Sequence, residues 1–364
     1  MHYFRKDLID KKPVNVNVPH KKVMMCLNES TLNPFEVLKK EIISKLEQVP
    51  LNRYFNNITL KLQTTLAEYA QVHEENIIYG NGADEMLFTV FNSVRDNNDS
   101  FAVSLSPSYF DYKSYSRAVG LNIKFMNLDE NYDFSVDKYC ELADDDNCKL
   151  VILCNPNNPT GNLLDDEKVI EVIKQNSQRI VMIDETYFEF SGKTFKDRID
   201  EFPNLVIVRS FSKAFSAAGL RFGYIISRKE NINEFKKIMT IFHSSMMIQA
   251  TVLTMLENKE IFLEQVAETN RQKKIVFEEL SNLHAVTVKK SATNFLAFTI
   301  GENTIDLFNF LSDNDIALRN IGAHPLLKNY IRVTICNEEE NKLFVEKVRE
   351  YFILTQRDSN TEKI

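Results

Sequence analysis

Short apolar runs alternate with amphipathic stretches along the first part of the chain. Residues 151–154, 180–183 and 205–208 read VILC, IVMI and LVIV, and such unbroken apolar runs are typical of strands buried on both faces of a sheet. Helical periodicity precedes them, for example over residues 35–46. The alternation predicts βα units on a mostly parallel sheet.

The pattern changes after about residue 230. Helical periodicity predicts long helices over residues 232–256 and 259–280. Further strands are predicted near residues 286–288, 294–300 and 331–335. No linker rich in Pro, Gly or Ser separates the two parts, so we expect a second, smaller domain that packs closely on the first and shares a long helix with it.

Composition narrows the class of protein. The 364 residues, 44% hydrophobic and 26% charged, suit a soluble globular protein of two or three domains. The net charge of -7 argues against nucleic acid as a partner. No segment has the form of a membrane span or a signal peptide, so we expect a cytoplasmic protein without a membrane partner. The five cysteines form no metal-ligand pattern, so we expect reduced thiols and no metal site.

The first candidate for chemistry follows the strand at 205–208. Ser210, Ser212 and Lys213 come at its carboxyl end, and Arg221 follows in a loop of small residues. Ligands of open α/β sheets bind at the carboxyl ends of strands. A lysine there can form an imine with a carbonyl cofactor, while the hydroxyls and the guanidinium bind phosphate oxygens. The alternative is an ordinary strand exit, because S-x-S-K strings are common.

The second candidate is Asp184, which ends the strand at 180–183 and is followed by Glu185 and Tyr187. A carboxylate at the end of a hydrophobic strand needs a cation as its partner. A protonated pyridine nitrogen would serve, and it must stay protonated to act as an electron sink. The alternatives are a metal-binding acidic pair and a helix N-cap.

Two turns and two tyrosines add weaker signals. In CNPNNPTG, residues 154–161, two X-Pro units fix a loop whose amide side chains can donate to a phenolate oxygen. In GNGAD, the backbone N–H groups of Ala83 and Asp84 open a helix and offer an anion site. Both also fit plain turn chemistry. Tyr54 and Tyr109 can each stack on a planar ring, but most tyrosines are packing residues.

Two late arginines, Arg319 and Arg332, lie among apolar, strand-like residues. An arginine in such a place is usually paired, and a carboxylate or phosphate of a substrate is a natural bidentate partner. A structural salt bridge is the alternative for each of them.

Taken in order, these motifs resemble those of fold-type I pyridoxal-phosphate aminotransferases of class I and II, and among them the histidinol-phosphate aminotransferases. The resemblance covers nearly the whole chain. It is carried by the strings LNES, NPF, NRY, GNGADE, PSYF, CNPNNPTG, IDETYFEF, RSFSKAF, AGLRFGY, SATNF and IRVT.

The resemblance implies an α/β fold with two domains. A large cofactor-binding domain, residues 36–240, would hold a mostly parallel seven-stranded sheet. A smaller α/β domain would consist of residues 241–364 together with the N-terminal arm, residues 1–35.

The resemblance also implies a cofactor, pyridoxal 5′-phosphate, and roles around its ring. Lys213 would bond to the cofactor and later act as general acid and base. Asp184 would pair with the pyridine nitrogen, Asn158 and Tyr187 would donate to the phenolic oxygen, and Tyr109 would stack on the ring.

The cofactor phosphate and the substrate are assigned in the same way. The residues implied for the phosphate are Ser210, Ser212, Arg221 and the amides of Ala83 and Asp84. Tyr54 would reach the cofactor phosphate of the neighbouring subunit in a homodimer. Arg332 would bind a substrate carboxylate, Arg319 the phosphate of histidinol phosphate, and Asn28 would line the substrate site.

The implied reaction moves an amino group between L-histidinol phosphate, or a similar amine or amino acid, and 2-oxoglutarate. Three alternatives remain: decarboxylation of a phosphorylated amino acid, as in threonine-phosphate decarboxylases, transamination of aromatic or other amino acids, and a non-catalytic binding protein. Departures from the family pattern fall in the string IFHSSMMIQA around His243 to Ala250, in AFSAAG after Lys213, and at Cys336. They bear on the choice of substrate rather than on the cofactor.

Overall fold

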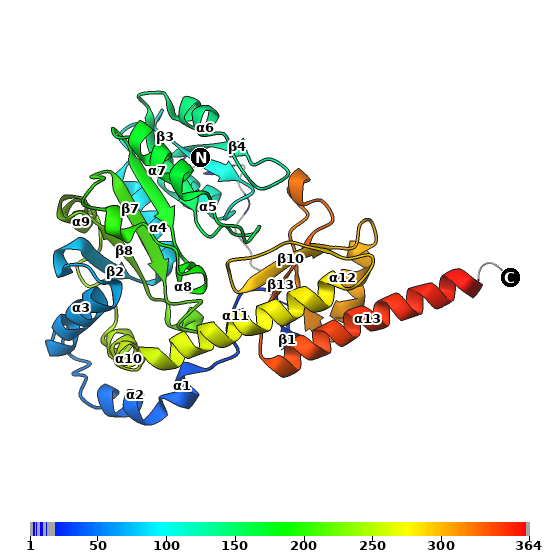
Figure 1. Cartoon of the computed structure of the whole chain (residues 1–364). Helices are drawn as coiled ribbons and strands as arrows, with labels where there is room; N and C mark the ends of the chain where they lie inside the picture. Colours follow the sequence, from blue (N-terminus) through cyan, green and yellow to red (C-terminus); the bar gives the residue numbers. More distant parts are fainter. Residues whose placement is uncertain (1–2, 4, 6–7, 10–11, 13–18, 362–364) are drawn as a thin grey trace.

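A seven-stranded sheet forms the centre of the larger part of the molecule (Figure 1). The computed structural model describes residues 3, 5, 8–9, 12 and 19–361. The strands are β2 (Ile77–Gly80), β3 (Phe101–Ser106), β4 (Asn122–Asn127), β5 (Cys148–Cys154), β6 (Ile180–Asp184), β7 (Leu205–Ser210) and β8 (Gly223–Ser227). Their order is β2-β8-β7-β6-β5-β3-β4; β8 pairs antiparallel with β2 and β7, and the other pairs are parallel. The expected mostly parallel, seven-stranded α/β fold is therefore confirmed.

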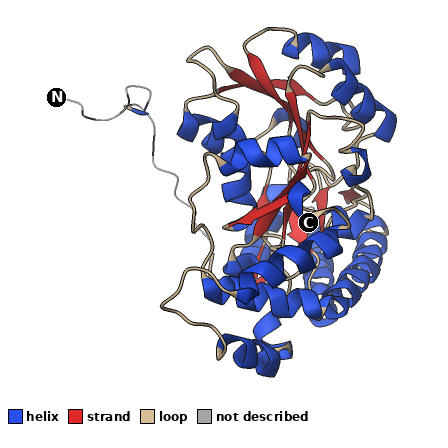
Figure 2. Cartoon of the chain, turned by 90° about the vertical axis from the view of Figure 1, so that its left-hand side faces the viewer, coloured by secondary structure: helices blue, strands red, loops and turns tan. Residues whose placement is uncertain are grey.

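Helices cover both faces of this sheet, as Figure 2 shows. Alternate residues of one strand explain why: in β7, Leu205 and Ile207 belong to one buried cluster, and Val206 and Val208 to another. The helices packed on the first cluster include α3 (Asn57–Ala70), α6 (Val136–Ala143) and α7 (Asp166–Gln175). Those packed on the second are α4 (Gly82–Ser93), α5 (Tyr112–Val119) and α9 (Lys229–Lys236). The wholly apolar strand sequences follow from this burial on two faces.

A second sheet lies in the C-terminal part of the chain. Its strands are β9 (Thr287–Val288), β10 (Phe295–Thr299), β12 (Arg319–Asn320) and β13 (Ile331–Thr334), all antiparallel in the order β12-β13-β10-β9. Beside it, β1 (Val23–Met24) pairs in parallel with β11 (Ile316–Ala317). The helices of this part are α12 (Thr304–Asp313) and α13 (Glu338–Thr361). The three strands expected here from the sequence are present.

One long helix, α11 (Lys259–Ser281), joins the two parts and is drawn in yellow in Figure 1. Phe262 and Val266 in its first half belong to the core beneath the large sheet. Val276 and Leu280 in its second half belong to the core of the C-terminal part. The expectation of a shared long helix is confirmed.

Two predicted helices are interrupted. The pattern over 35–46 is divided at Leu38 into α1 (Pro34–Val37) and α2 (Lys39–Leu46). The predicted helix over 232–256 is wrong as a single element, because α9 ends at Lys236 and α10 (Met246–Glu257) starts afresh. Ser245 caps α10 by accepting a hydrogen bond from the Ile248 N–H, and such a cap favours a new helix start.

The proposed domain boundaries, 36–240 against 1–35 with 241–364, stay a prediction. In the described structure α10 packs against α2 and α3 of the larger part. Among the described residues, no helix combines the length and the apolar character that crossing a membrane would require.

Candidate active site

Several predicted site residues meet at one edge of the large sheet. In the strand register, Cys154 lies opposite Asp184, Asp184 opposite Val208, and Ser210 opposite Gly223. Because β5, β6 and β7 are parallel, their carboxyl ends share this edge, and the antiparallel β8 begins there. The loops that follow these strands therefore bring their polar side chains together.

Lys213 lies just beyond the end of β7 with its amine in a part-buried position. Its Nζ donates a hydrogen bond of 2.9 Å to the carbonyl oxygen of Leu27. Burial, and next the positive charge of Arg332, lower the pKa of Lys213 from 10.5 to about 8. A larger fraction of this amine is thus neutral near neutral pH than of an ordinary lysine, and the neutral amine is the nucleophilic form.

Asp184 is buried at the end of β6, with 3% of its surface exposed. Its Oδ1 accepts from the Thr186 N–H at 3.0 Å, and its Oδ2 accepts from the Tyr112 hydroxyl at 2.8 Å. Burial raises the pKa of Asp184, whereas these hydrogen bonds lower it. Within the described part of the chain, Asp184 has no ion-pair partner, and no cluster of acidic, His or Cys side chains could hold a metal ion.

The turn between β2 and α4 lies against the start of β8. Gly82 has a φ of 85°, and Ala83 and Asp84 follow it in the first turn of α4. A Cβ on Gly223 would come within 2.3 Å of the Ala83 nitrogen, so only glycine permits this approach.

The side chains around this turn are polar. The Asp84 carboxylate pairs with Arg221 and accepts from the Tyr115 hydroxyl. The Ser212 N–H donates to Ser210 Oγ at 3.1 Å, at the end of β7. Helix N–H groups, two hydroxyls and a guanidinium are thus gathered at one place, which suits an anion.

Asn28 joins the N-terminal segment to the loop after β6 and to the second sheet. Its Nδ2 donates to the Tyr187 hydroxyl oxygen at 2.8 Å, and its backbone N–H donates to Thr334 Oγ1 at 2.9 Å. Its own carbonyl oxygen accepts from Asn294 Nδ2 at 3.0 Å. Burial raises the pKa of Tyr187 to about 12, so its hydroxyl stays protonated at neutral pH.

Arg332 reaches from the second sheet towards the large one. Its Nη1 donates to Asn158 Oδ1 at 2.7 Å and its Nη2 to the Cys26 carbonyl oxygen at 2.9 Å. Its Nε is buried and has no hydrogen-bond partner among the described residues. Arg319 lies directly opposite Arg332 in the strand register. The partners of Arg332 are neutral, so it is not held by the structural salt bridge that the sequence left open.

The two tyrosines differ in position. Tyr109 lies near the site, with its ring 5.4 Å from that of Tyr112 in an edge-on arrangement. Tyr54 is 73% exposed and stacks on Phe242, with ring centroids 4.1 Å apart. The side chain of Tyr54, a predicted site residue, therefore lies on the surface of this chain.

Three contributors were not predicted. Tyr112 and Tyr115 on α5 bind the carboxylates of Asp184 and Asp84. Arg209 forms a fully buried salt bridge of 2.8 Å with Glu185, and its guanidinium lies 3.5 Å from the centre of the Phe188 ring. In the sequence, the only signals for these contributors were Glu185 directly after Asp184 and Arg209 inside an apolar strand.

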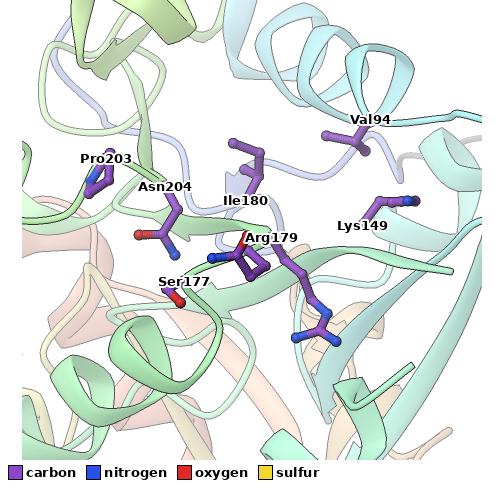
Figure 3. A pocket seen from close by; sticks show the side chains of 8 residues that line it. Val94, Lys149, Ser177, Arg179, Ile180, Pro203 and Asn204 are labelled. Atoms are coloured by element: carbon purple, nitrogen blue, oxygen red, sulfur yellow. The ribbon is translucent and has the colours of Figure 1, made fainter. Parts of the chain in front are cut away.

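A shallow hollow of about 380 Å³ lies at the opposite edge of the sheet (Figure 3). Lys149, Ile180 and Asn204 line it, near the amino ends of β5, β6 and β7. Figure 3 shows the charged ends of Lys149 and Arg179 pointing in different directions. None of the predicted site residues lines this hollow.

Comparison with known proteins decides the family. The family model described as aminotransferase class I and II matches residues 20–348. The chain belongs to this aminotransferase family. Pyridoxal 5′-phosphate is the cofactor of these aminotransferases, so the cofactor expected from the sequence is confirmed.

Individual known proteins are similar to this aminotransferase over most of its length. The histidinol-phosphate aminotransferase of Caldanaerobacter subterraneus subsp. tengcongensis is 33% identical over 334 residues, covering 92% of this chain and 94% of the relative. A histidinol-phosphate aminotransferase structure from Sinorhizobium meliloti, in complex with pyridoxal-5′-phosphate, has a TM-score of 0.84 at 21% identity, covering 96% of this chain and 99% of that one.

A solved L-threonine-O-3-phosphate decarboxylase from Porphyromonas gingivalis has the same fold, with a TM-score of 0.77 at 22% identity. It covers 91% of this aminotransferase and 99% of that chain.

The residues of this aminotransferase fit the cofactor. Asp184 is a buried carboxylate with two neutral donors and no cation among the described residues, as a partner for a pyridinium requires. The N–H groups of Ala83 and Asp84 with Arg221 suit its phosphate. The low pKa of Lys213 suits covalent attachment to an aldehyde.

Proposed function

We propose that this aminotransferase moves an amino group between L-histidinol phosphate, or a similar amine or amino acid, and 2-oxoglutarate. The observation that carries the proposal is the arginine pair on the second sheet. Arg319 and Arg332 are neighbours in register, and the buried Nε of Arg332 has no partner among the described residues. Two adjacent guanidinium groups suit a substrate with a phosphate or carboxylate group.

Lys213 and Asp184 carry the chemistry in this proposal. The bound cofactor supplies an electron sink that stabilises negative charge on the substrate carbon. Lys213 would hold the cofactor through its Nζ, and the same nitrogen, when free, would take up and give back a proton. A pKa near 8 suits this work, because an acid and base is most effective near the working pH. Asp184 would pair with the protonated pyridine nitrogen.

Tyr187 and Asn158 would both donate to the phenolic oxygen of the cofactor. Asn28 donates to the oxygen of Tyr187, which leaves the Tyr187 hydrogen free to donate onwards. Asn158 accepts from Arg332 through Oδ1, so its Nδ2 is the atom left to donate. Tyr109 would stack on the ring.

The phosphate of the cofactor would lie against the turn at the start of α4. Its ligands in this proposal are Ser210, Ser212, Arg221 and the amides of Ala83 and Asp84. Arg332 would bind a carboxylate of the amino donor or acceptor, and Arg319 the phosphate of the donor. Asn28 lies beside Tyr187 and would close the substrate site from the N-terminal side.

A homodimer completes this proposal. Tyr54 and its neighbours form an exposed apolar patch that a second copy of the chain would cover. The patch consists of Leu51, Tyr54, Phe55, Ile241, Phe242 and Met247, each at least half exposed. In such a dimer Tyr54 would reach the cofactor phosphate of the neighbouring subunit.

The test is a half-reaction followed by absorbance. Cofactor-loaded enzyme is mixed with L-histidinol phosphate in the absence of any oxo acid, and conversion of the cofactor from its aldehyde to its amine form is followed. Rapid, complete conversion is expected, and 2-oxoglutarate should then restore the starting spectrum. If only other amino acids convert the cofactor, the proposed donor is wrong. If the enzyme releases carbon dioxide from L-threonine O-phosphate and no such conversion occurs, the reaction is decarboxylation and not transamination.

A further inference from the structure

Tyr112 is the first residue of α5 and is fully buried behind the site. Its hydroxyl donates a hydrogen bond of 2.8 Å to Oδ2 of Asp184, a residue 72 positions away. The ring is held edge-on by Tyr109, with centroids 5.4 Å apart, and packs beside Phe91 at 6.4 Å. The Cys154 thiol also lies within hydrogen-bonding reach of this hydroxyl, and Oδ2 of Asp184 is the acceptor of the 2.8 Å bond.

The Tyr112 contact determines the orientation of the carboxylate. The Thr186 N–H already binds Oδ1, so the second donor fixes the remaining torsion of the Asp184 side chain. Each oxygen keeps a further lone pair for another donor. Burial raises the pKa of Tyr112 well above its ordinary value, so this hydroxyl stays protonated and can donate to the carboxylate.

The Tyr112 contact also affects the charge of Asp184. Burial favours the neutral acid, and hydrogen bonds to the ionised form oppose that tendency. If Asp184 became the more basic partner, the shared proton would move from the pyridine nitrogen to the carboxyl group. A donor from Tyr112 keeps the carboxylate the weaker base.

We infer that Tyr112 is a positioning residue that acts through Asp184, keeping the carboxylate ionised and aimed so that the pyridine nitrogen of the cofactor stays protonated. The inference rests on the role proposed above for Asp184. It adds a residue of α5 to the machinery of the reaction, and this residue need not touch the cofactor or the substrate.

The test is Tyr112→Phe, studied as the cofactor-loaded enzyme. The cofactor carries a ¹⁵N label at its ring nitrogen, and the ¹⁵N chemical shift reports directly on protonation. We expect the shift to move towards the unprotonated value and to titrate at lower pH than in the unaltered enzyme. The kcat should fall by about 10- to 100-fold, as for loss of a hydrogen bond to a charged group, with KM changed by less than about twofold.

Tyr139→Phe is the matched control. Tyr139 is also fully buried, but its hydroxyl donates to backbone carbonyl oxygens, those of Ile152 at 2.7 Å and Val103 at 3.2 Å. Its loss should lower stability and leave the ¹⁵N shift and kcat unchanged. If both variants move the shift equally, or Tyr112→Phe leaves it unchanged, the inference is wrong.

Two further variants separate the possible failures. Asp184→Asn should abolish ring protonation, and if the nitrogen remains protonated there, the role proposed for Asp184 fails. If Asp184→Asn has the expected effect and Tyr112→Phe has none, only the inference about Tyr112 fails. Should Tyr112→Phe not fold, 3-fluorotyrosine placed at residue 112 keeps the shape and donates more strongly. It should extend ring protonation to higher pH, and an unchanged titration would overturn the inference.

Discussion

Burial and neighbouring polar groups determine the protonation of two side chains at the edge of the large sheet. Lys213 loses most of its hydration and lies within the field of Arg332, and both effects disfavour its protonated form. Asp184 is buried as well, but neutral donors keep hydrogen bonds on both of its oxygens. The amine is thus made a better nucleophile while the carboxylate keeps its capacity to bind a cation.

The lowered pKa of Lys213 predicts a pH dependence for cofactor uptake. The neutral amine attacks the aldehyde, so the rate for the cofactor-free protein should rise about tenfold per pH unit below pH 8 and level off above it. Stopped-flow absorbance measures this rate. Lys213→Ala should show no covalent uptake and at least about a 10⁴-fold loss of transamination. A midpoint near the ordinary value of 10.5 would contradict the assigned environment.

The Arg209–Glu185 pair predicts a different kind of effect, on stability. Both side chains are fully buried, so Arg209→Met leaves an unpaired carboxylate in the interior. The free energy of unfolding should fall by about 3–5 kcal/mol, measured by urea unfolding of the cofactor-free protein. Arg209→Met combined with Glu185→Leu should recover part of the loss, because it removes the carboxylate that pairs with Arg209, while the buried Glu189 still loses a nearby positive charge. A double variant as unstable as the sum of the two single ones would contradict this account.

At the scale of elements, the start of β8 lies in close contact with the turn before α4. Gly223→Ala places a Cβ against the Ala83 backbone, which cannot move aside as a flexible side chain could. We expect cofactor affinity to weaken by about tenfold or more, as measured by equilibrium dialysis. Gly219→Ala is the matched control, since a Cβ there meets nothing within 4 Å. Equal affinities in the two variants would show that this approach does not shape the phosphate site.

Helices and strands were predictable where the local pattern of apolar residues specifies them. The apolar runs that became β5, β6 and β7 reveal their burial on two faces in the sequence alone. The break between α9 and α10 was missed because apolar periodicity continues through residues 237–245, while the Ser245 cap starts a new helix. Ile241 and Phe242 in this stretch are exposed, so their apolar character did not report a packed helix face.

The candidate site was predictable where a motif marks a strand end. Asp184 ends β6, Lys213 follows β7, and Arg221 precedes β8, so each lies at the end of a strand of the large sheet, as expected. Tyr112 could not be found in this way, because its only signal is a contact made across 72 residues of sequence. The Arg319–Arg332 juxtaposition likewise depends on the register of two short strands, which no local pattern specifies.

At the scale of the whole molecule, the exposed apolar patch around Tyr54 predicts self-association. Light scattering should give twice the mass of the 42.3 kDa chain. Leu51→Glu combined with Ile241→Glu should give the single-chain mass and lose most activity, because charges would replace two exposed apolar contacts. Ile353→Glu is the control, an exposed apolar residue on α13 whose replacement should leave the dimer intact. A single-chain mass for the unaltered protein would refute the proposed assembly.

The helix α11 has a consequence for how such a molecule can evolve. Its first half completes the core of the large sheet, and its second half completes the core of the other. Neither core is whole without the same 23 residues. Recombination between genes could not exchange one sheet as an independent module, because any breakpoint near this helix would leave one of the two cores with foreign packing. We therefore expect the two sheets to be inherited together.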